Sequence, residues 1–242
     1  MTKTPKDLLA STRQVFDECA AVYLQVDKHW GDDIDMVAEY LERFSTPEII
    51  EFGTGHAWHL ANVRLRNPKI KRALGIDSSS KMLAQARKTL EKHGMLKKVE
   101  LLHLDIFDMG LKNGSFDVGL LLNNTLGNLP GKTFDDAMNQ RKRALDAVSR
   151  VLRPRGYLIV SVFNARMLNE EDKYGEALEL DKAKSSVKTK DLVIRFKKTN
   201  TAYYSHWFTE EEVRDLLYEA GFTTHRVEER LKRIVIVGQK AP

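Results

Sequence analysis

Two glycines stand where a predicted strand meets a predicted helix. The short apolar segment 49–52 is followed by the turn Gly53-Thr54-Gly55, after which apolar residues recur at helical spacing. Glycines let a ligand approach the main chain closely, and the first turn of a helix offers N–H groups without an intrahelical partner. The next predicted strand ends at Asp77, about 20 residues further on, where a carboxylate can hold two ribose hydroxyls. This spacing predicts a site for a nucleotide-like ligand.

A dinucleotide is disfavoured as that ligand. A dinucleotide-binding loop needs a third glycine three positions after the second, where its helix packs closely on the strand. In this chain the bulky residues Trp58 and His59 occupy that region. A loop that cradles a pyrophosphate is therefore not expected here.

The residues around the turn form the pattern Glu51-x-Gly53-x-Gly55-x-Ala57. This pattern resembles the first motif of the class I S-adenosylmethionine-dependent methyltransferases, with Ala57 where that family usually carries a third glycine. The resemblance implies that Glu51, Gly53, Thr54 and Gly55 bind the methyl donor. The alternative is a simple turn after a strand, and the motifs that follow weigh against it.

A second motif of the same family follows the next two predicted strands. Ser78 and Met82 come after Asp77 at the start of a predicted helix, and a third predicted strand, 99–104, ends in Asp105-Ile106. The resemblance implies that Asp77, Ser78 and Met82 lie against the donor. It also implies that Asp105 accepts a hydrogen bond from the adenine amino group, and that the N–H of Ile106 meets a ring nitrogen. A helix cap is the alternative role for Asp105.

The fourth predicted strand, 116–122, leads into an asparagine-rich segment, Asn123-Asn124-Thr125-Leu126-Gly127-Asn128. This segment resembles the fourth motif of methyltransferases that act on small amines, glycine and sarcosine N-methyltransferases among them. Asn123 replaces a glycine of that motif and Asn128 stands where a histidine is common, so the substrate is not carried over. We expect Leu122, Asn123 and Asn128 at the donor site, where uncharged amides can orient a polar acceptor. A loop that caps the next helix is the alternative.

Two residues are candidates for a direct chemical role. Tyr23 ends the pattern Phe16-Asp17-x-x-Ala20-x-x-Tyr23, which resembles the amino-terminal segment that many small-molecule methyltransferases fold over their cofactor. His206 lies in an aromatic run, where it could orient or deprotonate an acceptor. The alternatives are an amphipathic helix for the first and a packed core histidine for the second.

Composition places the chain among globular proteins and excludes several classes. Its 242 residues suit one domain, and the apolar and charged fractions are 42% and 30%. Cys19 is the only cysteine, which excludes an intramolecular disulfide, and we expect it in the core; we expect no metal site. The start lacks a signal-peptide core and the longest apolar run, 118–122, is too short to cross a bilayer, so we expect a cytoplasmic protein without membrane contact. The net charge of +5 permits an anionic partner, but the basic residues are scattered.

Strands and helices alternate along most of the chain, which predicts an α/β fold with helices on both faces of a parallel sheet. The resemblance implies a doubly wound, mostly parallel, seven-stranded Rossmann-like sheet whose last strand is antiparallel. We expect a single domain, 1–242, with a helical lid at 1–45, a cofactor-binding core at 46–165, a substrate-side insertion after strand 5 at 166–206, and a helix and hairpin at 207–242. Within the insertion, 191–196 and 201–207 are predicted to pair as strands, and 169–190 shows no clear period. Elsewhere, apolar spacing predicts a helix over 11–27, and Arg153-Pro154-Arg155-Gly156 is expected to form the turn into the fifth strand. The pattern Thr209-x-x-Glu212 predicts a capping box at the start of the last helix.

The resemblance implies transfer of a methyl group from S-adenosylmethionine, with S-adenosylhomocysteine as product. Such a donor needs little activation, because loss of the thioether relieves a positive charge; the protein must mainly orient the acceptor in a dry cavity. We expect a small polar metabolite as acceptor. An RNA methyltransferase is the alternative, suggested by the basic charge and by a Tyr-x-His-x-Phe element similar to one in wobble-uridine tRNA methyltransferases. A cofactor-binding regulator without turnover is a third possibility, and the oligomeric state stays open.

Overall fold

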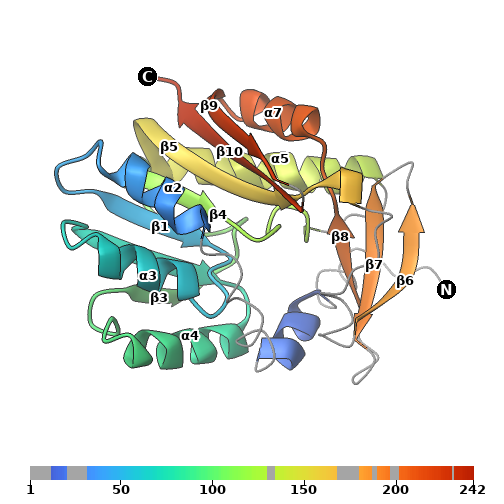
Figure 1. Ribbon diagram of the computed structural model, residues 1–242, viewed down its shortest axis with the longest axis horizontal. Coiled ribbons are helices and arrows are strands. Elements are labelled where there is room, and N and C mark those ends of the chain that lie inside the picture. Colours follow the sequence, from blue (N-terminus) through green and yellow to red (C-terminus); the bar gives the residue numbers. More distant parts are fainter. Residues whose placement is uncertain are drawn as a thin grey trace.

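A seven-stranded sheet forms the centre of the molecule (Figure 1). The computed structural model describes residues 12–20, 32–129, 134–167, 180–186, 190–196, 202–230 and 232–242. Across the sheet the strands are ordered β3 (Glu100–His103), β2 (Arg72–Asp77), β1 (Glu48–Phe52), β4 (Phe116–Leu121), β5 (Leu152–Phe163), β10 (Arg233–Lys240) and β9 (Phe222–Glu229). The first five are parallel, and β10 is antiparallel to both of its neighbours. The predicted mostly parallel, Rossmann-like sheet is therefore confirmed.

Helices cover both faces of this sheet because its central strands are apolar on both sides. Alternate residues of β1 separate to the two faces: Ile49 packs with α2 (Asp32–Leu41), α3 (Trp58–Arg66) and α4 (Ser80–Lys92). Ile50 packs on the other face with α5 (Phe134–Val151) and α7 (Glu210–Glu219). The two cores fix the register of the sheet, since a slip by one residue would exchange the faces.

The order of the strands reverses at β1, which pairs with β2 on one side and with β4 on the other. In open parallel sheets the crevice at such a reversal, beyond the carboxyl ends of the strands, is where ligands bind. The register places Phe52 beside Ile76, so the turn that starts at Gly53 lies next to Asp77. The fold thus brings the glycine turn and the acidic strand end to one edge.

The segment Arg153-Pro154-Arg155-Gly156, predicted as a turn, belongs to β5 instead. The β4–β5 ladder shifts register between Phe116 and Val118, and Arg155 has a φ of 63°. A bulge of this kind inserts residues while the strand continues, which Pro and Gly in the sequence do not distinguish from a turn.

A second, three-stranded antiparallel sheet lies between β5 and α7 in the chain. It consists of β6 (Leu180–Ser186), β7 (Asp191–Phe196) and β8 (Ala202–His206), and a 3-10 turn, Ala165–Met167, follows β5. The predicted pairing of 191–196 with 201–207 is confirmed. Strand β6 falls in the stretch predicted to be irregular, because its sequence carries no alternation and its pairing with β7 supplies the order.

The helical predictions agree with the structure where it describes them. Residues 12–20 are helical, within the helix expected over 11–27, and Tyr23 lies outside the described residues. Cys19 is buried, as expected. Thr209 and Glu212 form the predicted capping box of α7, each side chain bonded to the other's backbone N–H. In the described part of the chain, no helix is both long and apolar enough to span a membrane.

Candidate functional site

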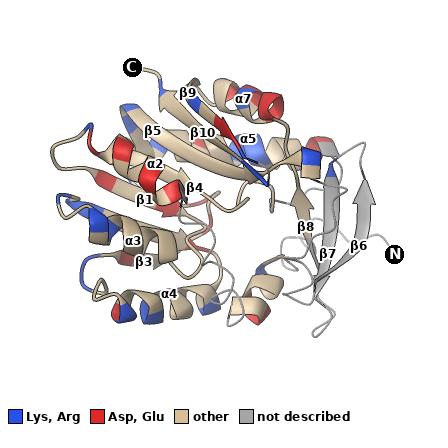
Figure 2. Ribbon diagram, in the orientation of Figure 1, with Lys and Arg blue, Asp and Glu red and all other residues tan. Residues whose placement is uncertain are grey.

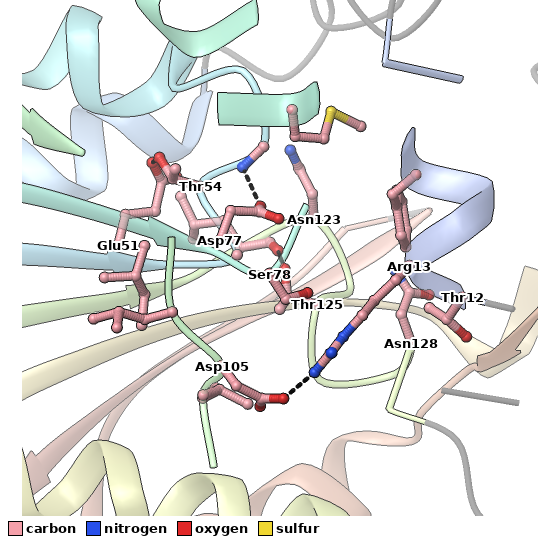
Figure 3. A pocket seen from close by; sticks show the side chains of 18 of the residues that line it. Thr12, Arg13, Glu51, Thr54, Asp77, Ser78, Asp105, Asn123, Thr125 and Asn128 are labelled. Carbon is pink, nitrogen blue, oxygen red and sulfur yellow. Dashed lines mark hydrogen bonds and ion pairs between the residues drawn. The ribbon is translucent and has the colours of Figure 1, made fainter. Parts of the chain in front are cut away.

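A cavity lies at the carboxyl ends of β1, β2 and β4 and beside the loop after β3, and the helix 12–20 closes one side of it (Figure 3). It brings together every predicted donor-binding residue that the structure describes: Glu51, Gly53, Thr54, Gly55, Asp77, Ser78, Met82, Asp105, Ile106, Leu122, Asn123 and Asn128. Residues that the sequence did not single out also line it: Thr12, Arg13, His56, Ile76, Leu104, Phe107, Thr125 and Leu129. Phe16 and His59 complete the wall.

The glycine turn is fixed by backbone conformation and by contact with the loop after β4. Gly53 and Gly55 have φ values of 66° and 55°, which side chains rarely adopt. A Cβ on Gly53 would lie 2.6 Å from Cγ2 of Thr125, whereas one on Gly55 would meet nothing within 4 Å. Thr54 donates its N–H to the carbonyl oxygen of Ile76 at 2.9 Å, which ties the turn to β2. Gly55 therefore leaves the main chain open to a ligand, and Gly53 also makes room for Thr125.

Ala57, in the position where the resembling family usually has a third glycine, is also left-handed, with a φ of 56°. It is the N-cap of α3, and no side chain caps that end of the helix. The preference for glycine at this position thus has a backbone cause, and alanine adopts the same conformation at an energetic cost.

Glu51 is a buried carboxylate at the base of the turn. Its side chain is 2% exposed and accepts a hydrogen bond from the Thr54 hydroxyl at 2.5 Å. Nδ1 of His59 lies 3.6 Å from its other oxygen. His56 and His59 are both buried, and the sequence interpretation treated His59 only as an obstacle to a third glycine. Their spacing of three residues just after the turn was the signal that could have placed them at the site.

Asp77 connects the two helix starts that border the cavity. Its carboxylate accepts hydrogen bonds from the N–H of Gly55 and the N–H of Ser79, both at 2.8 Å. Burial raises the pKa of Asp77, and these two hydrogen bonds oppose that rise. Because a carboxylate accepts about four hydrogen bonds, Asp77 is held in place with capacity left for a ligand's hydroxyl groups.

Asp105 stands on the opposite side of the cavity and is ion-paired with Arg13 of helix 12–20 (Figure 3). Its other oxygen accepts the N–H of Phe107 at 3.0 Å, a local turn. The same helix is attached to α4 through Asp17, which accepts a hydrogen bond from the Ser79 hydroxyl at 2.6 Å. Asp77 and Asp105 thus face one cavity, and the helix 12–20 contacts the loops that carry both of them.

The loop 123–129 forms the remaining wall. Asn123 has a left-handed φ of 52°, and its N–H donates to the Ser161 hydroxyl at 2.9 Å. The side-chain oxygens of Asn123 and Asn128 are buried and accept no hydrogen bond within the described part of the chain. Both residues line the cavity as uncharged polar groups.

His206 lies behind this loop and not on the cavity wall. It is fully buried, and its ring packs edge-on against Phe208 with 4.5 Å between ring centroids. Its backbone N–H donates to the carbonyl oxygen of Gly127 at 2.9 Å. His206 therefore lies on the side of the loop 123–129 that faces away from the cavity, which agrees with the alternative of a packed core histidine.

A cavity at the point where the strand order reverses, lined by a glycine turn and two carboxylates that follow strands, is typical of nucleotide-cofactor proteins of the doubly wound α/β class. Within that class, the model of a family described as "Methyltransferase domain" matches residues 45–221. The chain belongs to this methyltransferase domain family, and the predicted enzyme class is confirmed. A comparison with curated proteins finds no match.

Solved structures with the same fold include several methyltransferases. A SAM-dependent methyltransferase from Methanosarcina mazei shares 23% identity, with a TM-score of 0.65 over 85% of this chain and 97% of that one. The 1,6-didemethyltoxoflavin-N1-methyltransferase from Burkholderia thailandensis, solved with 1,6-didemethyltoxoflavin and S-adenosylhomocysteine, shares 16% identity, with a TM-score of 0.67 over 99% and 92%. The CcbJ methyltransferase from Streptomyces caelestis shares 16% identity, with a TM-score of 0.66 over 93% and 96%.

Proposed function

We propose that this protein transfers a methyl group from S-adenosylmethionine to a small polar metabolite. The observation that carries the proposal is the convergence of the glycine turn, Asp77 and Asp105 on one cavity (Figure 3). The Burkholderia thailandensis neighbour was solved with S-adenosylhomocysteine, and this supports the same cofactor here.

The donor set of the cavity fits an adenosyl group with an amino-acid tail. Asp77 offers carboxylate oxygens to neighbouring hydroxyls, and Asp105 offers them to an exocyclic amine. Glu51, buried and acidic, suits an ammonium group, because a charge-assisted hydrogen bond offsets the cost of burying both charges. When bound, this cofactor supplies an electrophilic methyl group on a positively charged sulfur.

Catalysis by the chain's own residues is then mainly a matter of orientation. The acceptor's lone pair must lie in line with the bond that breaks, in a cavity closed to water. The amides of Asn123 and Asn128 can orient a polar acceptor without adding positive charge near the sulfur. An amine acceptor must lose its proton before it attacks. Tyr23 is our candidate for that contact, because His206, the other candidate, is fully buried and does not line the described cavity.

A small acceptor fits the charge distribution better than RNA does. Arg13 is the only lysine or arginine among the residues that line the described cavity, and Asp105 pairs with it. Figure 2 shows acidic and basic residues together on α4 and α7, while the acidic residues of α2 lie beside the basic residues of α3. His206 and Phe208 of the Tyr-x-His-x-Phe element are fully buried, which leaves neither ring to contact a nucleic acid. A tRNA shift assay over a salt series tests this alternative, because phosphate contacts weaken steeply with salt.

The donor site is tested by calorimetry with S-adenosylhomocysteine. Asp77→Asn should weaken binding by at least about tenfold, because the amide replaces an oxygen that receives a charge-assisted hydrogen bond, worth about 1.5–3 kcal/mol. Asp117→Asn is the matched control: Asp117 accepts the N–H of Glu48 at 2.8 Å and pairs with Arg153 at the far end of the sheet. Equal binding by the wild type and Asp77→Asn would refute the site.

The same titration has an expected dependence on pH. Burial raises the pKa of Asp77, so its carboxylate takes up a proton at a higher pH than an ordinary aspartate does. Since the ionised form accepts the ribose hydroxyls, affinity should fall as the pH is lowered through this raised pKa. The Asp77→Asn variant should lack that titration, which separates Asp77 from other acids of the cavity.

A further inference from the structure

Asn124 is fully buried behind the cavity, where it joins the loop 123–129 to β5 and β8. Its side-chain amide donates to the Ser205 hydroxyl at 3.0 Å and to the carbonyl oxygen of His206 at 3.2 Å, both in β8. Its side-chain oxygen accepts the N–H of Phe163, at the end of β5, at 3.0 Å. Its own N–H donates to the carbonyl oxygen of Ser161 at 2.9 Å. Asn124 thereby fixes the start of the loop 123–129 to both β5 and β8.

The residues on either side of Asn124 belong to the cavity. Asn123 and Thr125 line it, and the N–H of Asn128 donates to the Asn124 carbonyl oxygen at 3.0 Å. Asn124 is left-handed, with a φ of 59°, so the two neighbouring side chains depend on a backbone conformation that is unfavourable without support. A shift of this loop would move four residues of the cavity wall together, since Leu129 also lines the cavity.

The loop also packs directly against the glycine turn. The Thr125 side chain fills the space that a Cβ on Gly53 would need. On its other side, Gly127 lies so close to the His206 carbonyl oxygen and to the Asn124 amide that a Cβ would approach them to 2.4 and 2.5 Å. Contacts therefore run without a break from β8 through Asn124 and Thr125 to the Gly53 turn.

We infer that Asn124 is a positioning residue for methyl transfer: it holds the loop 123–129 against the glycine turn, and so couples the small sheet to the donor cavity. An amide suits this role because it donates twice and accepts once in a site closed to water. An aspartate cannot donate when ionised, and an apolar side chain would leave the N–H of Phe163 and the His206 carbonyl without partners. The inference rests on the proposed donor site.

The chain contains a matched control for this inference. Asn164 is also buried, and its amide donates to Glu229 at 3.0 Å and to the Arg230 carbonyl oxygen at 3.2 Å. Its oxygen accepts the N–H of Arg166 at 3.0 Å. The bonding of the two asparagines is thus alike, but Asn164 ties the end of β5 to the β9–β10 hairpin and makes no hydrogen bond to the loop 123–129 in the described part of the chain.

The experiment compares Asn124→Ala with Asn164→Ala by calorimetry with S-adenosylhomocysteine, well below the Tm of both variants. Both should lower the Tm, while only Asn124→Ala should weaken binding, by at least about tenfold, because misplaced binding groups cost affinity without any lost contact. If Asn124→Ala alone loses affinity, the inference holds. Equal affinity in the two variants overturns it. A wild type that does not bind S-adenosylhomocysteine refutes the donor site itself, which is a separate result.

A second variant covers the case in which Asn124→Ala does not fold. In Asn124→Asp the ionised carboxylate faces the His206 carbonyl oxygen, whereas the protonated form can donate to it. The ratio of the variant's Kd for S-adenosylhomocysteine to that of the wild type should therefore fall at least about threefold as the pH is lowered from about 8 to about 5.5. Taking a ratio removes the titration of Asp77, which both proteins share. A ratio near one, or one independent of pH, overturns the inference.

Discussion

Replacing Arg13 by methionine should strengthen the binding of S-adenosylhomocysteine. Arg13 pairs with Asp105, the carboxylate expected to accept the adenine amino group (Figure 3). The other Asp105 oxygen is engaged by the N–H of Phe107. Each oxygen could accept a second hydrogen bond, but Arg13 lines the cavity and holds Asp105 from that side, so we expect an incoming amine to displace the guanidinium. Methionine preserves the apolar stem of the side chain and removes the charge.

The size of the effect follows from how exposed the ion pair is. The side chains of Arg13 and Asp105 are 47% and 34% exposed. Exposed pairs of this kind contribute about 0.2–1 kcal/mol, which corresponds to a gain in affinity of about 1.4- to 5-fold when the pair no longer has to be broken. Because salt screens an exposed pair, the affinity of the wild type should also rise with ionic strength, and Arg13→Met should remove that dependence.

Isothermal calorimetry at low and high salt measures both quantities. Arg66→Met is the control, because Arg66 pairs with Asp35 at 2.6 Å on the far end of α3, and both side chains are more than half exposed. Its affinity and salt dependence should match those of the wild type. Weaker binding by Arg13→Met would refute the reasoning, because it would mean that Arg13 contacts the donor and does not compete with it.

Three further changes have expected outcomes. Ala57→Gly should alter the free energy of unfolding, measured by urea denaturation, by less than about 1 kcal/mol. Relief of the left-handed conformation should offset both the loss of a buried methyl group and the greater entropy of the unfolded chain. Ala57→Val, measured in the same way, should clearly destabilise the protein. Asp33→Ala should cost about 3–5 kcal/mol in the same assay, because Asp33 is fully buried and pairs with Arg230 and Arg233 at 3.0 and 2.6 Å; a cost below about 1 kcal/mol would contradict this. Burial raises the pKa of the Cys19 thiol to about 12, so a thiol reagent should label the native protein at least about 100-fold more slowly than the denatured protein; equal rates would show that helix 12–20 does not shield Cys19.

The sequence predicted the residues that follow the carboxyl ends of strands. Gly53, Asp77 and Asp105 each come directly after an apolar segment, and parallel strands must bring such positions to one edge. These predictions needed only local patterns and the rule that the strands are parallel. The residues proposed to bind the donor, which follow strands, were therefore predictable from the sequence.

The residues that support this edge were not predictable in the same way. Arg13 reaches Asp105 from a helix whose pattern indicates only an apolar face. Asn124 bonds to Phe163 and Ser205, which are 39 and 81 residues away in the chain. An asparagine in a loop has no local signal that distinguishes such a role from turn formation. Partners of this kind are fixed by tertiary structure, which the pattern of one segment does not contain.

Gly53 shows how such tertiary contacts enter a motif that is usually explained by its ligand. Its φ of 66° alone would favour glycine at the turn. The contact with Thr125 is a second, independent requirement, because even a residue that tolerated the left-handed conformation would displace the loop 123–129. Gly55 has the first requirement without the second, since nothing lies within 4 Å of a Cβ there. The two glycines of the turn therefore do different work: Gly55 leaves space that a ligand can use, and Gly53 leaves space that the protein itself fills.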